Sequence, residues 1–479
     1  MAPYLKISRA IIYILLVCAL SLPIVSGISA EFRPNISGPS SSPFSAYIPL
    51  IASPNFSIFG ASLSPHNSTG EIQKVAMAGS VWTRIGLDWR LIEPSYGNFD
   101  WSQARSVEQA LVAINQEGLQ PILILDSTPV WALKPIFSCG AILQDFFPEF
   151  AKFAKEVVKR YSVPPYNVKY FEIYNEPDAA GILGCWGDPG DIPYYGGVYY
   201  GQFLQTVYPA IKSVNPNAQV LVGGLLMDCD PDNPPIIMST GQRKDCMSTR
   251  FFDGILISGA GNSFDGVSFH SYDYYAGPGQ YNNINWNSSR TLNGSSSLQK
   301  AAYLRNTMQK YGVAEKPLFD TEYALFCGDE YFNTCSGFQG ELEATKAYYV
   351  VQFMTNAMAD NYKAAVWYKT MGGGRNVSIL KPDLTPLPVY NAYKFTNQQI
   401  GNTQYSQQIS DPDFVIHEFK KANAKIWIVW TKDNLTHTLT LPTLPSGIYR
   451  IGTDGNPISD PPTDAITLDM APAIIVFAQ

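Results

Sequence analysis

The feature that most constrains the fold of this chain is a series of short apolar segments that alternate with longer segments of helical periodicity. The apolar segments are rich in β-branched residues, which is typical of buried strands. They cover residues 56–62, 82–89, 121–127, 168–175, 218–224, 264–272, 316–323 and 364–370. Eight strands that alternate with helices predict a parallel sheet closed into a (β/α)8 barrel. A doubly wound open sheet is the alternative, but the glycine fingerprint that such folds normally carry is absent.

The two ends of the chain differ from this pattern. Residues 1–30 combine Lys6 and Arg9 with a long apolar run and then small residues, as in a cleavable export signal, and predict a secreted protein. An uncleaved membrane anchor is the alternative. Residues 31–54 are rich in Ser and Pro and are expected to be a linker, with the barrel at 55–400. Residues 405–479 contain short alternating strands with turn residues, which predict a small antiparallel β-module.

Composition excludes several classes of function. The formal net charge is −7 and no run of Lys or Arg occurs, so binding to nucleic acid is disfavoured. The four histidines are far apart in sequence, which argues against a histidine-based metal site. No phosphate-binding loop, dinucleotide fingerprint or serine nucleophile elbow is present, and therefore no cofactor is expected.

Six cysteines follow the export segment, and an even number in an exported chain suggests disulfides. Six cysteines allow 15 pairings. The simplest arrangement pairs neighbours along the chain, as Cys229–Cys246 and Cys327–Cys335, and leaves Cys139–Cys185.

Two glutamates stand at the carboxyl ends of predicted strands, the face on which barrel enzymes carry their chemistry. Glu176 follows the fourth strand in FEIYNEPDA, and Glu322 ends the seventh in LFDTEYAL. These strands lie roughly across the barrel mouth from each other, so the two carboxylates could flank one bond. A retaining glycosidase uses such a pair, about 5–5.5 Å apart, as nucleophile and as proton donor and then base. Asn175 is placed to hydrogen-bond a sugar hydroxyl.

Asn-Glu-Pro after the fourth strand, with Glu after the seventh, resembles clan A of the glycoside hydrolases. The resemblance implies that Glu176 is the acid/base and Glu322 the nucleophile. It also implies supporting roles for Arg84 beside the nucleophile, for His270 and Tyr272 in contact with the nucleophile or substrate, and for Trp367 as the floor beneath the sugar. The segment 88–101 and the appended β-module are most like family 39, and family 5 is also possible. The aromatic-rich segments 184–200 and 271–286 are expected to be loops that shape the cleft.

The sequence therefore predicts a secreted retaining glycoside hydrolase that acts on a β-linked glycoside or polysaccharide. A non-catalytic carbohydrate-binding protein on a barrel scaffold is one alternative. A transglycosylase, which would use the same residues with a different acceptor, is the other. The sequence does not distinguish among sugars or linkages.

Overall fold

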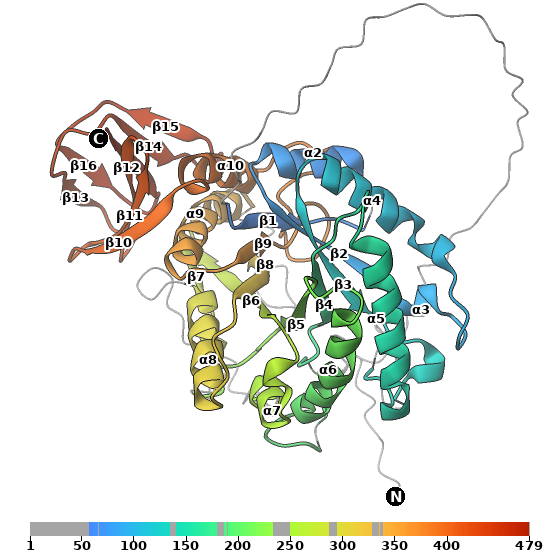
Figure 1. The fold of residues 1–479 in the computed structure, drawn as a ribbon. Helices are drawn as coiled ribbons and strands as arrows, with labels where there is room; N and C mark the ends of the chain where they lie inside the picture. The colour runs from blue at the N-terminus through green and yellow to red at the C-terminus, as the bar shows by residue number, and fades with distance from the viewer. Residues whose placement is uncertain are drawn as a thin grey trace, which may run out of the picture. The chain divides into compact units, whose positions relative to one another are not determined.

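Eight parallel strands form a closed barrel in the computed structural model of the chain, with helices around them (Figure 1). The structure describes residues 57–65, 67–134, 140–179, 186–188, 190–232, 250–286, 295–327, 335 and 339–478. All of the described elements belong to one unit, Pro54–Gln479. The predicted export segment, the anchor alternative and the linker lie outside the described residues. Among the helices that are described, none is both long and apolar enough to cross a membrane.

The barrel strands match the eight predicted segments. They are β1 (Phe59–Ser62), β2 (Trp82–Asp88), β3 (Gln120–Asp126), β4 (Tyr170–Asn175), β5 (Gln219–Leu225), β6 (Gly266–Gly277), β8 (Leu318–Phe326) and β9 (Ala364–Trp367). The seventh and eighth predicted strands are thus labelled β8 and β9. Each strand pairs in parallel with the next around the barrel, and β5 pairs with β6 to close it. The predicted barrel is confirmed.

The helices that follow the strands carry an apolar face toward the barrel. They are α2 (Thr69–Met77), α3 (Trp89–Ile92), α4 (Arg105–Gln116), α5 (Phe147–Tyr161), α6 (Gly197–Lys212), α7 (Phe251–Ile257), α8 (Ser296–Lys310), α9 (Gln339–Ala359) and α10 (Pro388–Ile400). In α5 every apolar residue at helical spacing is buried, from Phe150 through Val157 to Tyr161. This stripe covers the strands, as its periodicity predicts.

The barrel interior is apolar toward the amino ends of the strands and polar above. Trp82, Ile122 and Phe319 belong to the buried apolar cluster in the interior, against which Tyr170 packs. Because alternate residues of a strand share a face, Arg84 lies one layer above Trp82, and Glu172 lies one layer above Tyr170. The apolar layer therefore supports a layer of buried charges beneath the barrel mouth.

One segment departs from the prediction. β6 continues to Gly277 and turns into an antiparallel partner, β7 (Gln280–Asn282), where a cleft-shaping loop was expected. Gly277 and Gly279 have φ values of 126° and 64°, which only glycine adopts readily, so the chain reverses there. Across the hairpin, Tyr274 is in register with Asn282 and Tyr275 with Tyr281.

The carboxyl-terminal module is an antiparallel β-structure, as predicted. Its larger sheet contains β10 (Gln404–Ser410), β11 (Phe414–Lys421), β12 (Ala424–Thr431), β14 (Gly447–Ile451), β15 (Pro457–Asp460) and β17 (Ala473–Ala478). A two-stranded sheet contains β13 (His437–Thr440) and β16 (Ala465–Leu468). Along β12, Ile428 belongs to the same apolar cluster as the barrel, and Val429 belongs to a second cluster within the module. Strand β12 is therefore buried on both faces.

One of the predicted disulfides is observed, between Cys327 and Cys335. Cys229 is also disulfide-bonded. Its predicted partner Cys246, and the predicted pair Cys139–Cys185, lie outside the described residues.

Candidate active site

Glu176 reaches the barrel mouth because the backbone leaves β4 in an unusual conformation. Tyr174 and Glu176 have φ values of 68° and 44°, a region that non-glycine residues rarely occupy. The turn at Tyr174 sends its ring outward, where its hydroxyl lies 2.6 Å from that of Thr128. Asn175 then faces the interior, and the Glu176 N–H donates to the carbonyl of Gly224 at 3.0 Å. A regular strand would have placed the two side chains on opposite faces.

Glu322 faces the interior because β8 carries one extra residue. Phe269 of β6 is in register with Asp320, whereas the next residue, His270, is in register with Glu322. Thr321 is thus bulged out of the pairing, and the bulge turns Glu322 to the side that alternation would otherwise give to its neighbour. His270 and Glu322 become cross-strand neighbours beneath the mouth.

Arg84 connects the two sides of the site. It donates to Glu172 and to Glu322, and its Nη2 also donates to Oδ1 of Asn175 at 2.8 Å. Although burial opposes it, the carboxylates of Glu172 and Glu322 raise the pKa of Arg84, so the guanidinium is charged. The Asp88 carboxylate bonds to Arg90 at 3.0 Å.

Glu322 is held by a second donor. The Tyr272 hydroxyl donates to its Oε2, while Arg84 donates to its Oε1. The Tyr272 ring stacks on Phe326 with centroids 4.3 Å apart, which fixes the hydroxyl's direction. With both oxygens accepting hydrogen bonds, Glu322 is arranged as an ionised carboxylate.

His270 lies between the two glutamates. Its Nδ1 is 2.8 Å from Oε1 of Glu176 and 3.6 Å from Oε2 of Glu322. The imidazole is fully buried, and burial lowers the pKa of His270 to about 4, so the ring is neutral near pH 7. Among the described residues Nε2 has no hydrogen-bond partner. Because a buried N–H is seldom left unpaired, this favours a proton on Nδ1, where it can be donated to a glutamate.

Glu176 and Glu322 are in different electrostatic environments. Burial raises the pKa of Glu176 to about 7, against the opposing effect of Arg84 and Lys300, so this carboxyl holds a proton over much of the neutral range. The ligand-type atoms of Glu176, His270 and Glu322 lie within 4.8 Å of one another. One carboxyl that can donate a proton thus faces one that is held as an anion, which is the division of roles needed for acid/base and nucleophilic catalysis.

The same three side chains could geometrically meet a cation. Both oxygens of Glu322 already accept hydrogen bonds from Arg84 and Tyr272, and a cation would have to displace a buried guanidinium. His270 already contacts Glu176 at hydrogen-bond distance. The donor set therefore fits proton transfer better than metal binding.

Trp367, predicted as the floor beneath the sugar, lies elsewhere. It is fully buried, its indole N–H donates to the carbonyl of Val377 at 2.9 Å, and its ring packs on Tyr323. Along β9, Ala364 and Val366 face the barrel interior, so Trp367 faces the helices and Tyr368 faces inward again. Tyr368 is the aromatic residue beside the carboxylates, and burial together with Glu322 and Glu176 raises its pKa to about 12.

Further residues of the site carried no sequence signal that singled them out. Glu172 lies on the interior face of β4. It stands four residues before Glu176, and strand alternation would place both side chains on the same face. Asp178 follows Glu176 by two residues and accepts the N–H groups of Leu226 and Met227, each at 2.8 Å. Lys300 of α8 is buried, and its Nζ donates to the carbonyls of Leu226 and His270.

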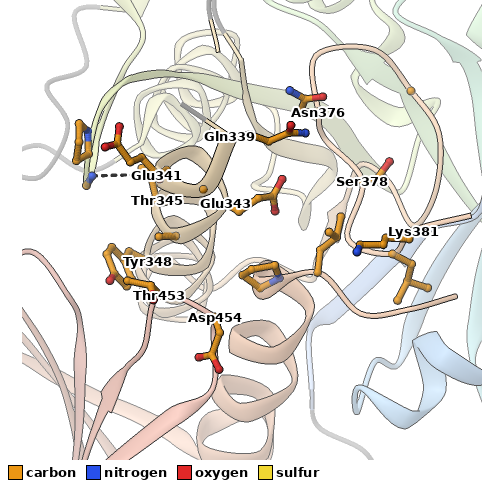
Figure 2. Close-up of a pocket in the computed structure, with 18 of the residues that line it drawn as sticks. Gln339, Glu341, Glu343, Thr345, Tyr348, Asn376, Ser378, Lys381, Thr453 and Asp454 are labelled. Carbon is orange, nitrogen blue, oxygen red and sulfur yellow. Dashed lines mark hydrogen bonds between the residues drawn. The ribbon is translucent and has the colours of Figure 1, made fainter. Parts of the chain in front are cut away.

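Two hollows open at this end of the barrel. A cavity of about 340 Å³ is lined by Arg84 and Tyr368 together with small residues such as Ser62 and Gly86, and its lining does not include Glu176 or Glu322. A larger one, of about 1110 Å³, lies between the start of α9, the segment after β9 and the module (Figure 2). Glu343, Lys381 and Asp454 line this second hollow, and neither Glu176 nor Glu322 does.

The barrel and the paired glutamates at its carboxyl face define the protein as a glycoside hydrolase of clan A. Residues 51–370 match the family model described as cellulase, glycosyl hydrolase family 5. The chain belongs to this family, and it is a glycosidase. Family 39, which the sequence analysis placed first, is found among the structural relatives. No curated protein matches the chain.

Solved structures share the fold at low sequence identity. A family 39 glycoside hydrolase from Bacteroides cellulosilyticus is 18% identical, with 88% of this chain and 80% of that chain covered and a TM-score of 0.66. A family 30 subfamily 8 xylanase from Clostridium acetobutylicum is 12% identical, with 87% and 95% covered and a TM-score of 0.58. An exported protein from Bacteroides fragilis is 12% identical, with 88% and 97% covered and a TM-score of 0.62.

Proposed function

We propose that this protein is a secreted glycosidase that cleaves a β-linked glycoside or polysaccharide with retention of configuration, with Glu322 as nucleophile and Glu176 as acid/base. The observation that carries the proposal is the separation of the two carboxyls, whose oxygens approach within 4.8 Å. Retaining enzymes have their carboxyls about 5–5.5 Å apart, whereas inverting enzymes need about 6.5–9.5 Å to admit a water. The short separation favours direct attack by one carboxylate.

In the first step, the Glu322 carboxylate attacks the anomeric carbon as the bond from that carbon to the leaving oxygen breaks. Glu176 transfers its proton to that oxygen, and the sugar remains esterified to Glu322. In the second step, the Glu176 carboxylate takes a proton from water while the water oxygen attacks the anomeric carbon. The ester bond breaks, and both glutamates return to their starting states. The pKa of Glu176, about 7, suits a group that must give and then take a proton.

The neighbouring side chains assist these steps. Arg84 and Tyr272 hold Glu322 ionised and oriented before it attacks. Asn175 accepts from Arg84 through Oδ1, because a guanidinium can only donate, and its amide N–H₂ is left to donate to a sugar hydroxyl. Such a bond to the hydroxyl beside the anomeric carbon strengthens in the transition state. Tyr368, which lies near both carboxylates, would contact the ring of the sugar.

The assignment of Glu176 and Glu322 is tested by substitution and rescue. Glu176→Ala should lose turnover of aryl β-glycosides with basic leaving groups. On a dinitrophenyl β-glycoside, whose first step needs no acid, azide should attack the glycosyl-enzyme, speed turnover and give a β-glycosyl azide. Glu322→Ala should lose turnover and yield an α-glycosyl azide. Glu117→Ala, at an exposed position after α4, is the control. Full activity of Glu322→Ala would contradict the proposal, and glycan binding without turnover by the unmodified enzyme would favour a non-catalytic role.

Export is a separate part of the proposal and rests on residues 1–30. Amino-terminal sequencing of protein recovered from the culture medium should find a start near residue 30. Retention of residues 1–30 in a membrane fraction would support the anchor alternative instead.

A further inference from the structure

A buried lysine lies behind the acid/base. Lys300 of α8 is only 2% exposed, and its Nζ donates to the carbonyls of Leu226 at 2.6 Å and of His270 at 2.8 Å. Taking an ammonium out of water is costly unless its hydrogen bonds are replaced. The two carbonyls replace hydrogen bonds that the ammonium would make to water.

The two carbonyls that Lys300 binds stand where the barrel's own pairing stops. The last pair in register between β5 and β6 is Leu225 with Phe269. Leu226 and His270 are the next residues on the two strands. By bonding both carbonyls, Lys300 joins β5 and β6 one residue beyond the ladder. At His270, β6 is still paired with β8 on its other side, and Lys300 holds the side that faces β5, where pairing has ended.

These contacts form a ring that includes Glu176. His270 contacts Glu176 through Nδ1 at 2.8 Å and Lys300 through its carbonyl. Lys300 bonds the carbonyl of Leu226, and the N–H of the same residue donates to Asp178 at 2.8 Å. Asp178 lies two residues after Glu176, which closes the ring. A substitution at Lys300 therefore affects the acid/base from two sides.

We propose that Lys300 is a positioning residue for the acid/base: through the carbonyls of Leu226 and His270 it holds the imidazole against Glu176. This inference rests on the proposed function, since it assumes that Glu176 is the proton donor.

The charge of Lys300 acts within a set of groups that face Glu176. They are Arg84 from β2, Glu172 from β4, Asp228 after β5, His270 and Tyr272 from β6, Glu322 from β8 and Tyr368 after β9. Burial raises the pKa of Glu176, and the positive charges of Arg84 and Lys300 lower it. Loss of the Lys300 charge should therefore raise this pKa and move the alkaline limb of kcat/KM to higher pH.

The test compares Lys300→Met and Lys300→Gln with the unmodified enzyme on aryl β-glycosides whose phenols differ in basicity. Dinitrophenolate leaves without a proton, whereas an alkylphenolate needs the acid. Lys300→Met should lower kcat/KM on the alkylphenyl substrate by about 100-fold, the scale of a displaced catalytic group. On the dinitrophenyl substrate the loss should be only a few fold. Lys300→Gln retains hydrogen-bond donors but carries no charge. It should therefore be more active than Lys300→Met on the alkylphenyl substrate, and its alkaline limb should still lie at higher pH than that of the unmodified enzyme.

Lys346→Met is the matched control. Lys346 is also fully buried, and its Nζ donates to the carbonyls of Asn376 and Ser378 at 2.6 and 3.3 Å and pairs with Glu343 at 2.7 Å. Glu343 and both carbonyl-bearing residues line the larger hollow, away from Glu176 (Figure 2). The control should lower stability and leave the dependence on leaving group unchanged.

Equal losses on both substrates, with an unmoved alkaline limb in both Lys300 variants, would overturn the role of Lys300 and leave the proposed function intact. If the unmodified enzyme itself turned over no aryl β-glycoside, the proposed function would fail and this inference with it. The inference would be supported if the Lys300 variants lost kcat/KM on the alkylphenyl substrate alone and Lys346→Met showed no such loss.

Discussion

The Nδ1 atom of His270 lies 2.8 Å from Oε1 of Glu176, in a ring that is fully buried. Because burial lowers the pKa of His270 to about 4, this contact joins a neutral imidazole to a carboxyl rather than forming an ion pair. Glu176 can therefore gain and lose its proton without breaking a salt bridge. The positive charge that compensates the carboxylates of Glu322 and Glu172 comes instead from Arg84, which pairs with both.

The first prediction concerns pH. Burial raises the pKa of Glu176 to about 7, and the acid must be protonated before the first bond breaks. The protonated fraction falls as pH rises, so kcat/KM on a substrate with a basic leaving group should decline above about pH 7. Glu176→Gln should lose most activity on that substrate and show no limb near pH 7 on a dinitrophenyl glycoside. An unchanged limb in Glu176→Gln would assign it to another group.

The second prediction concerns the Tyr272 hydroxyl. Tyr272→Phe removes one of the two donors to Glu322 and preserves the ring that stacks on Phe326. We expect kcat to fall by about 10- to 100-fold, since a preorganised hydrogen bond to a reacting group is worth roughly that much or more. The variant should also lose about 1.5–3 kcal/mol of stability, because the hydroxyl bonds a charged group.

The matched control for this variant is Tyr281→Phe. The Tyr281 hydroxyl is also buried and donates to Gln352 at 2.8 Å, but it does not reach the glutamates. This variant should lose about 1 kcal/mol of stability at unchanged kcat. Equal kcat values for the two variants would contradict a role of Tyr272 at the nucleophile.

The third prediction concerns the buried guanidinium. Arg84→Met would leave Glu172 and Glu322 without their cation in the barrel interior. Removing one partner of a buried ion pair costs about 3–5 kcal/mol. Chemical denaturation should show a loss of that size, and adding Glu172→Gln should recover part of it by neutralising one stranded carboxylate. A loss below about 1 kcal/mol would mean that the carboxylates have another source of compensation.

Much of the fold could be predicted because each barrel strand is an apolar run of ordinary length. Glu176 and Glu322 could also be found, since their motifs stand at strand ends. Trp367 could not be placed correctly, because the face of a residue in a short apolar strand depends on a one-residue register. Tyr368 faces the site and Trp367 faces the helices.

The residues that complete the site depend on local irregularities that no periodicity reveals. Glu322 faces inward only because Thr321 is bulged, and Asn175 faces inward only because Tyr174 adopts a positive φ. Lys300 lies in a helix whose one other lysine, Lys310, is exposed, and its sequence neighbours do not mark it as buried. Its position follows from where the pairing of β5 and β6 ends.

The fourth prediction concerns stability in acid. His417 of the module is buried against Trp430, and burial lowers its pKa to about 4. The unfolded chain takes up this proton below about pH 6.5, whereas the folded chain does not, so stability is lost as pH falls from about 6.5 to 4. Between pH 7 and 5 the contribution is about 2 kcal/mol. In urea denaturation, the free energy of unfolding should fall between pH 7 and pH 5 by about 2 kcal/mol less in His417→Phe than in the unmodified protein. Equal losses would show that His417 titrates normally in the folded state.

The central claim is that Glu322 attacks the anomeric carbon directly, with Glu176 opposite it. Proton NMR of the first sugar released from an aryl β-glycoside, recorded before the anomers equilibrate, tests this claim most directly. Two displacements at one carbon restore the configuration, so the β-anomer should appear first and the α-anomer only later by mutarotation. Initial release of the α-anomer would mean a single displacement by water, and the assignment of Glu322 as nucleophile would be wrong.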